Sequence, residues 1–69
     1  MEERLNSLIG KTVSVMDNRF YFTGKIYSRF HGIYTLEIYC DNEYAFVEFQ
    51  AEDVVKIQRT HNGFEIVLK

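Results

Sequence analysis

The stretch IYTLEIYCDNEYAFVEFQ, residues 33–50, contains two runs of alternating apolar and polar side chains, separated by Asp41-Asn42. Successive side chains of a β-strand point to opposite faces, so this period of two predicts strands that each bury one face. Two such runs joined by two turn-forming residues predict a β-hairpin. Its register places Tyr39 opposite Tyr44 on the outer face.

The same alternation continues through the rest of the chain after residue 10. It predicts six strands, at residues 11–17, 20–29, 33–40, 43–50, 54–60 and 64–69. A three-residue loop at FHG pairs Arg29 with Ile33, and a two-residue loop at Asn62-Gly63 pairs Arg59 with Ile66. Each loop leaves the apolar side chains of its two strands on one face, and a slip of one residue would invert that face.

The side chains expected inside follow from this parity. They are Val13, Val15, Phe20, Phe22, Ile26, Phe30, Tyr34, Leu36, Ile38, Cys40, Ala45, Val47, Phe49, Val55, Ile57, Phe64, Ile66 and Leu68. Before the first strand, Leu5, Leu8 and Ile9 have helical spacing and Gly10 stands at a C-cap position, which predicts a helix over residues 2–9. We expect this helix to pack on the core. The segment AED, residues 51–53, predicts one turn of tight helix between two strands.

Six short strands in sequential hairpins predict a mainly β protein: a small SH3-like barrel of five to six antiparallel strands with a short N-terminal helix. The chain resembles Sm-like proteins in a helix ending in LIG, followed by GKTVSV, FTGKI and VVKI, over residues 5–57. This resemblance implies the barrel fold. The family's RNA-binding motifs are not matched, because SRFHGIYTL and QAED stand at their positions, so uridine binding is not implied. The hairpin over residues 54–69 also exceeds the family's usual five strands, which puts ring assembly in doubt.

Length and composition point to one small domain over residues 1–69. The hydrophobic fraction of 46% is well above that of a disordered chain, and the net charge is −2. A single cysteine, Cys40, excludes a disulfide within the chain and is typical of a reducing compartment. The N-terminus is acidic, and no apolar run reaches the ~18–20 residues that span a bilayer. We expect a cytoplasmic protein that does not bind membranes.

Side chains capable of catalysis or metal binding are few: Cys40, His31, His61, Asp17, Asp41 and Asp53. A thiol on the inward parity is generally an inert small hydrophobe. Neither histidine has a second ligand at a metal-binding spacing such as C-x-x-C or H-E-x-x-H. We therefore expect a protein that is not an enzyme and that has no cofactor or metal.

The outer face carries an unusual number of aromatic side chains. Parity directs outward Tyr21, Tyr27, Tyr39, Tyr44 and Phe46. A contiguous exposed apolar patch usually marks an interface, so we expect this face to bind a protein partner or a second copy of the chain. The alternative is that the N-terminal helix or the curvature of the strands covers part of it.

A second interpretation is a weak nucleic-acid-binding module. In FYFTGKIYSRFHG, residues 20–32, Tyr21 and Tyr27 could stack on bases while Lys25 and Arg29 follow the phosphates. However, Lys25 is predicted to lie opposite Glu37, and an acidic chain lacks the counterion release that supplies most nucleic-acid affinity. This interpretation therefore ranks below protein binding.

Overall fold

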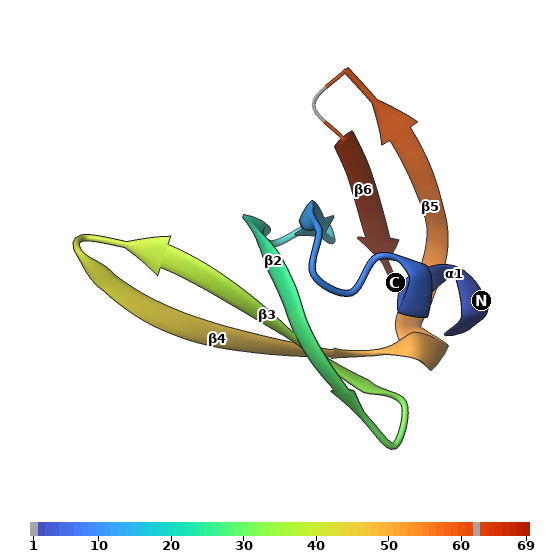
Figure 1. The fold of residues 1–69 in the computed structure, drawn as a ribbon. Helices are drawn as coiled ribbons and strands as arrows, with labels where there is room; N and C mark the ends of the chain where they lie inside the picture. The colour runs from blue at the N-terminus through green and yellow to red at the C-terminus, as the bar shows by residue number, and fades with distance from the viewer. Residues whose placement is uncertain (1, 62) are drawn as a thin grey trace.

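The described residues, 2–61 and 63–69 of a computed structural model, contain six β-strands and one short α-helix (Figure 1). The order is α1 (Glu2–Ser7), β1 (Thr12–Met16), β2 (Tyr21–Phe30), β3 (Ile33–Cys40), β4 (Glu43–Gln50), the 3-10 helix η1 (Ala51–Asp53), β5 (Val54–Thr60) and β6 (Gly63–Leu68). The prediction of a mainly β protein with a short N-terminal helix is confirmed. The tight helical turn between β4 and β5 is also confirmed.

All six strands form one sheet in the order β4-β3-β2-β1-β6-β5. Neighbouring strands are antiparallel except β1 and β6, which run parallel. The parallel pair arises because β6, rather than β5, lies beside β1. Within the described residues, β4 and β5 pair on one side only, so the sheet is open and the predicted closed barrel is not seen.

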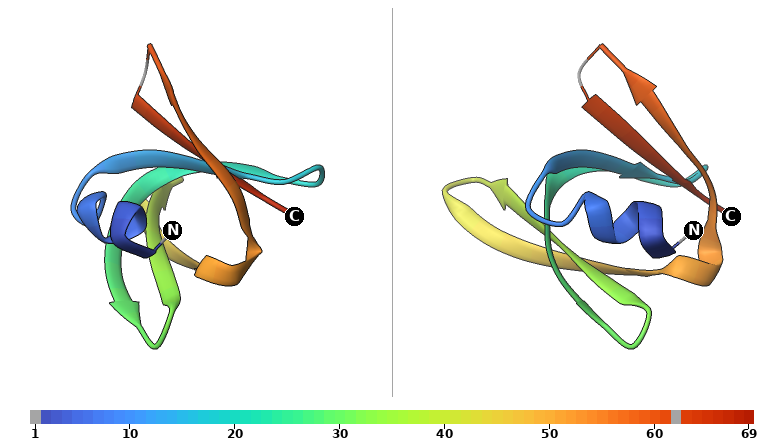
Figure 2. Two further views of the ribbon diagram at one scale, coloured as in Figure 1. Left: turned by 90° about the vertical axis from the view of Figure 1, so that its right-hand side faces the viewer. Right: turned by 45° about the vertical axis from the view of Figure 1, so that its right-hand side comes forward.

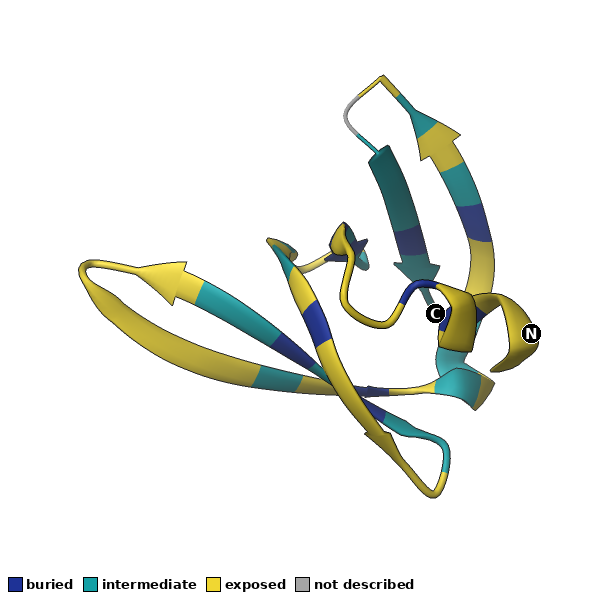
Figure 3. Cartoon of the chain, viewed as in Figure 1, coloured by how far each residue is buried: buried dark blue, intermediate teal, exposed yellow. Residues whose placement is uncertain are grey.

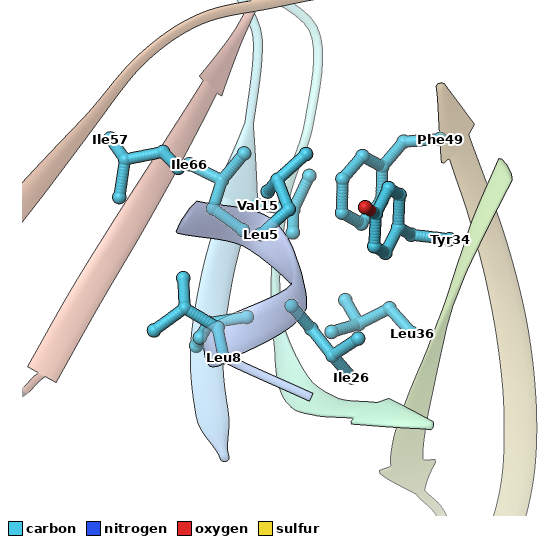
Figure 4. Close-up of a cluster of buried hydrophobic side chains, with 10 residues drawn as sticks. Leu5, Leu8, Val15, Ile26, Tyr34, Leu36, Phe49, Ile57 and Ile66 are labelled. Carbon is cyan, nitrogen blue, oxygen red and sulfur yellow. The ribbon is translucent and has the colours of Figure 1, made fainter. Parts of the chain in front are cut away.

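The sheet curves strongly, and α1 lies on its concave inner side (Figure 2). The expectation that α1 packs on the core is confirmed by its leucines, which meet side chains from opposite ends of the sheet (Figure 4). The buried core comprises Leu5, Leu8, Val13, Val15, Ile26, Tyr34, Leu36, Phe49, Ile57 and Ile66. The helix ends at Ser7, before Ile9, so Ile9 is exposed and its predicted place in the helix is wrong.

The β3–β4 hairpin has the predicted bounds and register. Tyr39 lies opposite Tyr44 and Glu37 lies opposite Phe46. The two turn residues Asp41 and Asn42 both have positive φ, at 53° and 66°. Because this left-handed conformation matches the twist of the flanking strands, a two-residue turn fixes the register.

The β2–β3 hairpin differs from its predicted register near the turn. The loop contains two residues, His31 and Gly32, and a β-bulge between Ile26 and Ser28 inserts one extra residue into β2. A bulge of one residue reverses the side-chain parity beyond it. Arg29 therefore lies opposite Tyr34 rather than Ile33, on the same face of the sheet as Tyr34 instead of the predicted outer face. Phe30 is 71% exposed instead of buried.

The β5–β6 hairpin is displaced from its prediction without changing its faces. Asn62 of the predicted turn lies outside the described residues, but Arg59 pairs with Phe64 rather than Ile66. A displacement by an even number of residues keeps each side chain on its face. A second bulge, between Val54 and Lys56, turns Val55 outward, which corrects its predicted inner position.

The distal end of the β3–β4 hairpin extends beyond the core (Figure 3). Cys40 and Ala45 have the inward parity that was predicted, yet both are exposed. Parity determines the face of the strand on which a side chain lies, but the side chain is buried only if another element packs against that face. No part of α1 reaches this end of the hairpin (Figure 1).

Candidate protein-binding surface

Four exposed aromatic side chains cluster on the convex face formed by β2, β3 and β4. Their rings form two contacts: the centroids of Tyr27 and Phe46 are 5.8 Å apart, and those of Tyr39 and Tyr44 are 4.9 Å apart. Tyr44 and Phe46 are neighbours on the same face of β4, so the two contacts belong to one surface. We call Tyr27, Tyr39, Tyr44 and Phe46 the aromatic patch.

The local sequence explains how the patch is assembled. The two-residue turn after β3 sets Tyr39 beside Tyr44, and the same register places Phe46 across from Glu37. Tyr27 is the residue inserted at the bulge of β2, and its ring meets Phe46 edge-on, with an interplanar angle of 65°. Edge-to-face contacts between rings are favourable, so the exposed rings are held in place by one another.

The helix does not cover the aromatic patch. Leu5 and Leu8 bind α1 to the concave face of the sheet, whereas the patch lies on the convex face. All four patch side chains are exposed. The position of α1 excludes covering by the helix, and the exposure of all four side chains excludes covering by the curvature of the strands.

Tyr21, the fifth predicted interface residue, is directed away from the patch. Its hydroxyl donates a hydrogen bond to Ser14 Oγ on β1 at 3.1 Å, and Ser14 Oγ also lies 2.9 Å from Thr23 Oγ1. Tyr21 is as exposed as the patch residues. It belongs to a separate polar cluster on β1 and β2.

Phe30 is an exposed aromatic side chain that the sequence reading placed inside. Its ring lies 4.2 Å from that of His31, centroid to centroid, at the turn between β2 and β3. The signal that could have revealed it is the pair His31-Gly32, since both residues take positive φ and form a two-residue turn. A two-residue loop pairs Phe30 with Ile33, and the bulge at Tyr27 accommodates this pairing with that of Ile26 and Leu36.

The two cations assigned to the nucleic-acid alternative lie apart from each other. Lys25 is exposed and lies opposite Glu37, as predicted. Arg29 instead crosses to α1, where its Nη2 lies 2.9 Å from Glu2 Oε1. The hydrogen bond from Arg29 to Glu2, together with the charge of that carboxylate, raises the pKa of the guanidinium.

Arg29 and Tyr34 together hold α1 against the sheet. Tyr34 donates its hydroxyl hydrogen to Asn6 Oδ1 at 2.7 Å, and its ring stacks on Phe49 with centroids 5.6 Å apart. Burial raises the pKa of the Tyr34 hydroxyl. Satisfying a buried hydroxyl in this way removes the cost of taking it out of water.

Asp17 has a structural part in the turn between β1 and β2. Its Oδ1 accepts hydrogen bonds from the backbone N–H groups of Arg19 at 2.6 Å and Phe20 at 3.1 Å, and its Oδ2 pairs with Arg19 Nη2 at 3.2 Å. Burial opposes ionisation of this carboxyl, but the hydrogen bonds from Arg19 and Phe20 outweigh it. The pKa of Asp17 is therefore below its ordinary value.

The remaining candidates for chemistry are dispersed. His31, Asp41 and His61 lie in turns, Cys40 is exposed at the end of β3, and Asp53 lies in η1. Among the described residues, no three His, Cys, Asp or Glu side chains gather in an arrangement that could hold a metal ion. The described part of the chain also has no helix with the length and hydropathy needed to span a bilayer.

No protein-family model, curated protein or solved structure matches the chain.

Proposed function

We propose that this protein is a non-enzymatic binding module that associates with another protein chain through the aromatic patch. One observation carries the proposal: four exposed rings from three strands form a contiguous surface that no other element of the described chain covers. Tyrosine and phenylalanine contribute large contact area at low entropic cost, and they are enriched at interfaces. A chain of this size also gains stability from an intermolecular surface, because its own core is small.

The nucleic-acid alternative has less support. Arg29 is engaged by Glu2, and Lys25 lies opposite Glu37, which weakens the positive field that a phosphate backbone requires. The absence of a cofactor or metal, and action in the cytoplasm, remain part of the proposal.

The finer fold assignment is also a proposal. The curved sheet, the order of β1 to β4 and the 3-10 helix before β5 support a relation to small SH3-like or Sm-like barrels. The insertion of β6 between β1 and β5 departs from the five strands usual in that class.

The test compares three proteins by size-exclusion chromatography with light scattering and by affinity for any protein that co-purifies. They are the natural chain, a double variant with Tyr39→Ser and Phe46→Ser, and a control with Tyr21→Ser. The control removes a tyrosine of matched exposure, 59% against 60% for Tyr39. We expect the double variant to lose association while keeping its circular dichroism spectrum, and the control to associate normally. Association that persists in a folded double variant would refute the proposal.

A further inference from the structure

β4 is an open edge of the sheet beside the aromatic patch. It pairs with β3 on one side, and no strand in the described chain pairs with its other side. Hydrogen-bonding groups alternate in direction along an antiparallel strand, so every second residue of β4 offers an unpaired donor and acceptor. Residues 43–46 are exposed on both faces (Figure 3). This half of β4 can therefore accept a further strand without displacing any element.

The opposite edge, β5, is less available. Arg4 of α1 donates a hydrogen bond from Nη2 to the backbone carbonyl of Ile57 at 3.3 Å. The helix lies beside β5 in the view of Figure 1. A strand arriving at β5 would meet α1 and compete with Arg4 for a backbone acceptor, so β4 is the more accessible edge.

Acidic and basic residues are distributed unevenly along the chain. Residues 33–55, which include β3 and β4, contain six acidic residues and no Lys or Arg, while the remaining residues contain eight basic and four acidic side chains. Glu43 and Glu48 are both exposed on β4. Pairing of β4 with β4 of a second copy would place two acidic segments side by side, each without Lys or Arg, and such a juxtaposition of like charge is destabilising.

We propose that the β4 edge binds an extended segment of a partner protein in which Lys or Arg alternates with apolar residues. This inference rests on the proposed function, and it names the partner's chemistry and its mode of attachment. Main-chain hydrogen bonds to an edge strand supply affinity, and alternate side chains supply specificity.

The side chains of such a segment would meet complementary groups on both faces of β4. On the convex face, cationic side chains would lie over the rings of Tyr44 and Phe46 with Glu48 close by, which combines cation–π attraction with charge pairing. On the concave face, apolar side chains would extend the row of Ala45 and Val47. The acidic edge thus favours a basic strand and disfavours a second copy.

The experiment titrates isotope-labelled protein with three synthetic octapeptides and follows backbone amide shifts by NMR. The first peptide repeats Lys-Val four times, the second repeats Glu-Val four times, and the third is the Lys-Val peptide with its second Val replaced by Pro. The third peptide keeps the charge but interrupts main-chain pairing. We expect the Lys-Val peptide to shift amides of β4 and to bind more tightly than both others.

Two charge variants sharpen the test. Glu48→Lys should weaken binding of the Lys-Val peptide about fivefold, because one cross-strand attraction becomes a repulsion. Glu3→Lys, on α1, changes the net charge equally and should leave the affinity unchanged.

Several results would overturn the inference. These are equal binding of the Pro-containing peptide, shifts confined to other strands, or no binding at millimolar peptide. A dimer with protected β4 amides in the absence of peptide would instead identify a second copy as the occupant. The Tyr39→Ser and Phe46→Ser variant could lose a co-purifying protein while the β4 amides of the natural chain do not shift with any peptide. That combination would support the proposed function and refute only the inference about the β4 edge.

Discussion

Gly24 lies in the middle of β2, where the backbone of β3 passes too close for a side chain. A Cβ atom at this position would collide with the carbonyl oxygen of Glu37 and would approach Ile38 Cγ2 to 2.9 Å. The first obstacle is backbone of a paired strand, so it cannot move aside without disturbing the β2–β3 pairing.

Gly24→Ala should therefore lower the free energy of unfolding by about 1–3 kcal/mol, the usual range for overpacking. Urea denaturation followed by circular dichroism measures this change. Ser28→Ala, an exposed substitution on the same strand, should stay within about 0.5 kcal/mol. Equal stability of the Gly24→Ala variant and the natural chain would show that β3 does not pass so close to β2.

Asp17 should make stability dependent on acid pH. Its pKa falls below the ordinary value of 3.8 on folding, so the ionised carboxyl stabilises the folded state at all pH values above the unfolded pKa. This stabilisation is lost as the pH falls through the folded pKa. The difference in unfolding free energy between the natural chain and Asp17→Asn should thus be constant near neutral pH and shrink below about pH 4.

Urea denaturation of both proteins across this pH range checks the prediction, with Asp41→Asn as the control for a carboxyl exposed in a turn. A difference that does not change with pH would mean that the hydrogen bonds to Asp17 do not favour its ionised form.

At the scale of elements, α1 completes the core and does not merely flank it. Leu5 is fully buried between side chains of β5 and β6 and those of β3 and β4 (Figure 4). Leu5→Ala should lower the free energy of unfolding by about 2–5 kcal/mol, which is comparable to the total stability expected of so small a domain. Thermal unfolding should show a largely unfolded variant at room temperature.

Ile9→Ala is the matched control for Leu5→Ala, because Ile9 follows the same helix but is exposed. It should cost less than about 1 kcal/mol. If the two variants are equally stable, α1 does not pack on the concave face as described.

The register of two paired strands could be predicted where the residue types of the turn reveal the number of residues in the loop. Asp41-Asn42 reads as a two-residue turn flanked by alternating strands, and the register of β3 and β4 followed from it. The segment around Tyr27 did not reveal its bulge, because a bulge changes parity by one residue and leaves no distinct residue type. Arg29 was misplaced for this reason, and its partner Glu2 is distant in the sequence.

The candidate site was predictable to a similar extent. Parity correctly turned Tyr39, Tyr44 and Phe46 outward, because the turn at Asp41-Asn42 fixes the register of β3 and β4. Tyr27 is exposed as predicted, although it is the extra residue of the bulge. The hydrogen bond of Tyr21 to Ser14 forms between two strands, and the exposure of Cys40 depends on how far the core extends. Sequence alternation carries neither kind of information.

In the whole molecule, the two faces of one curved sheet have different parts. The concave face buries α1 and supplies stability, whereas the convex face of β2 to β4 holds exposed rings. Residues 33–55, which include β3 and β4, also carry six of the ten acidic residues, while cations such as Lys11 and Lys56 lie on other segments. Such asymmetry favours one orientation of an approaching partner.

Site-specific photo-crosslinking in the cells that naturally produce the protein tests directly whether the aromatic patch contacts another protein. A benzoyl-phenylalanine residue would replace Phe46 in one protein and Tyr21 in a second, which is the control of similar exposure. We expect a discrete crosslinked protein from position 46 that disappears with Tyr39→Ser, and none from position 21. No protein adduct at position 46, or equal adducts at both positions, would contradict it.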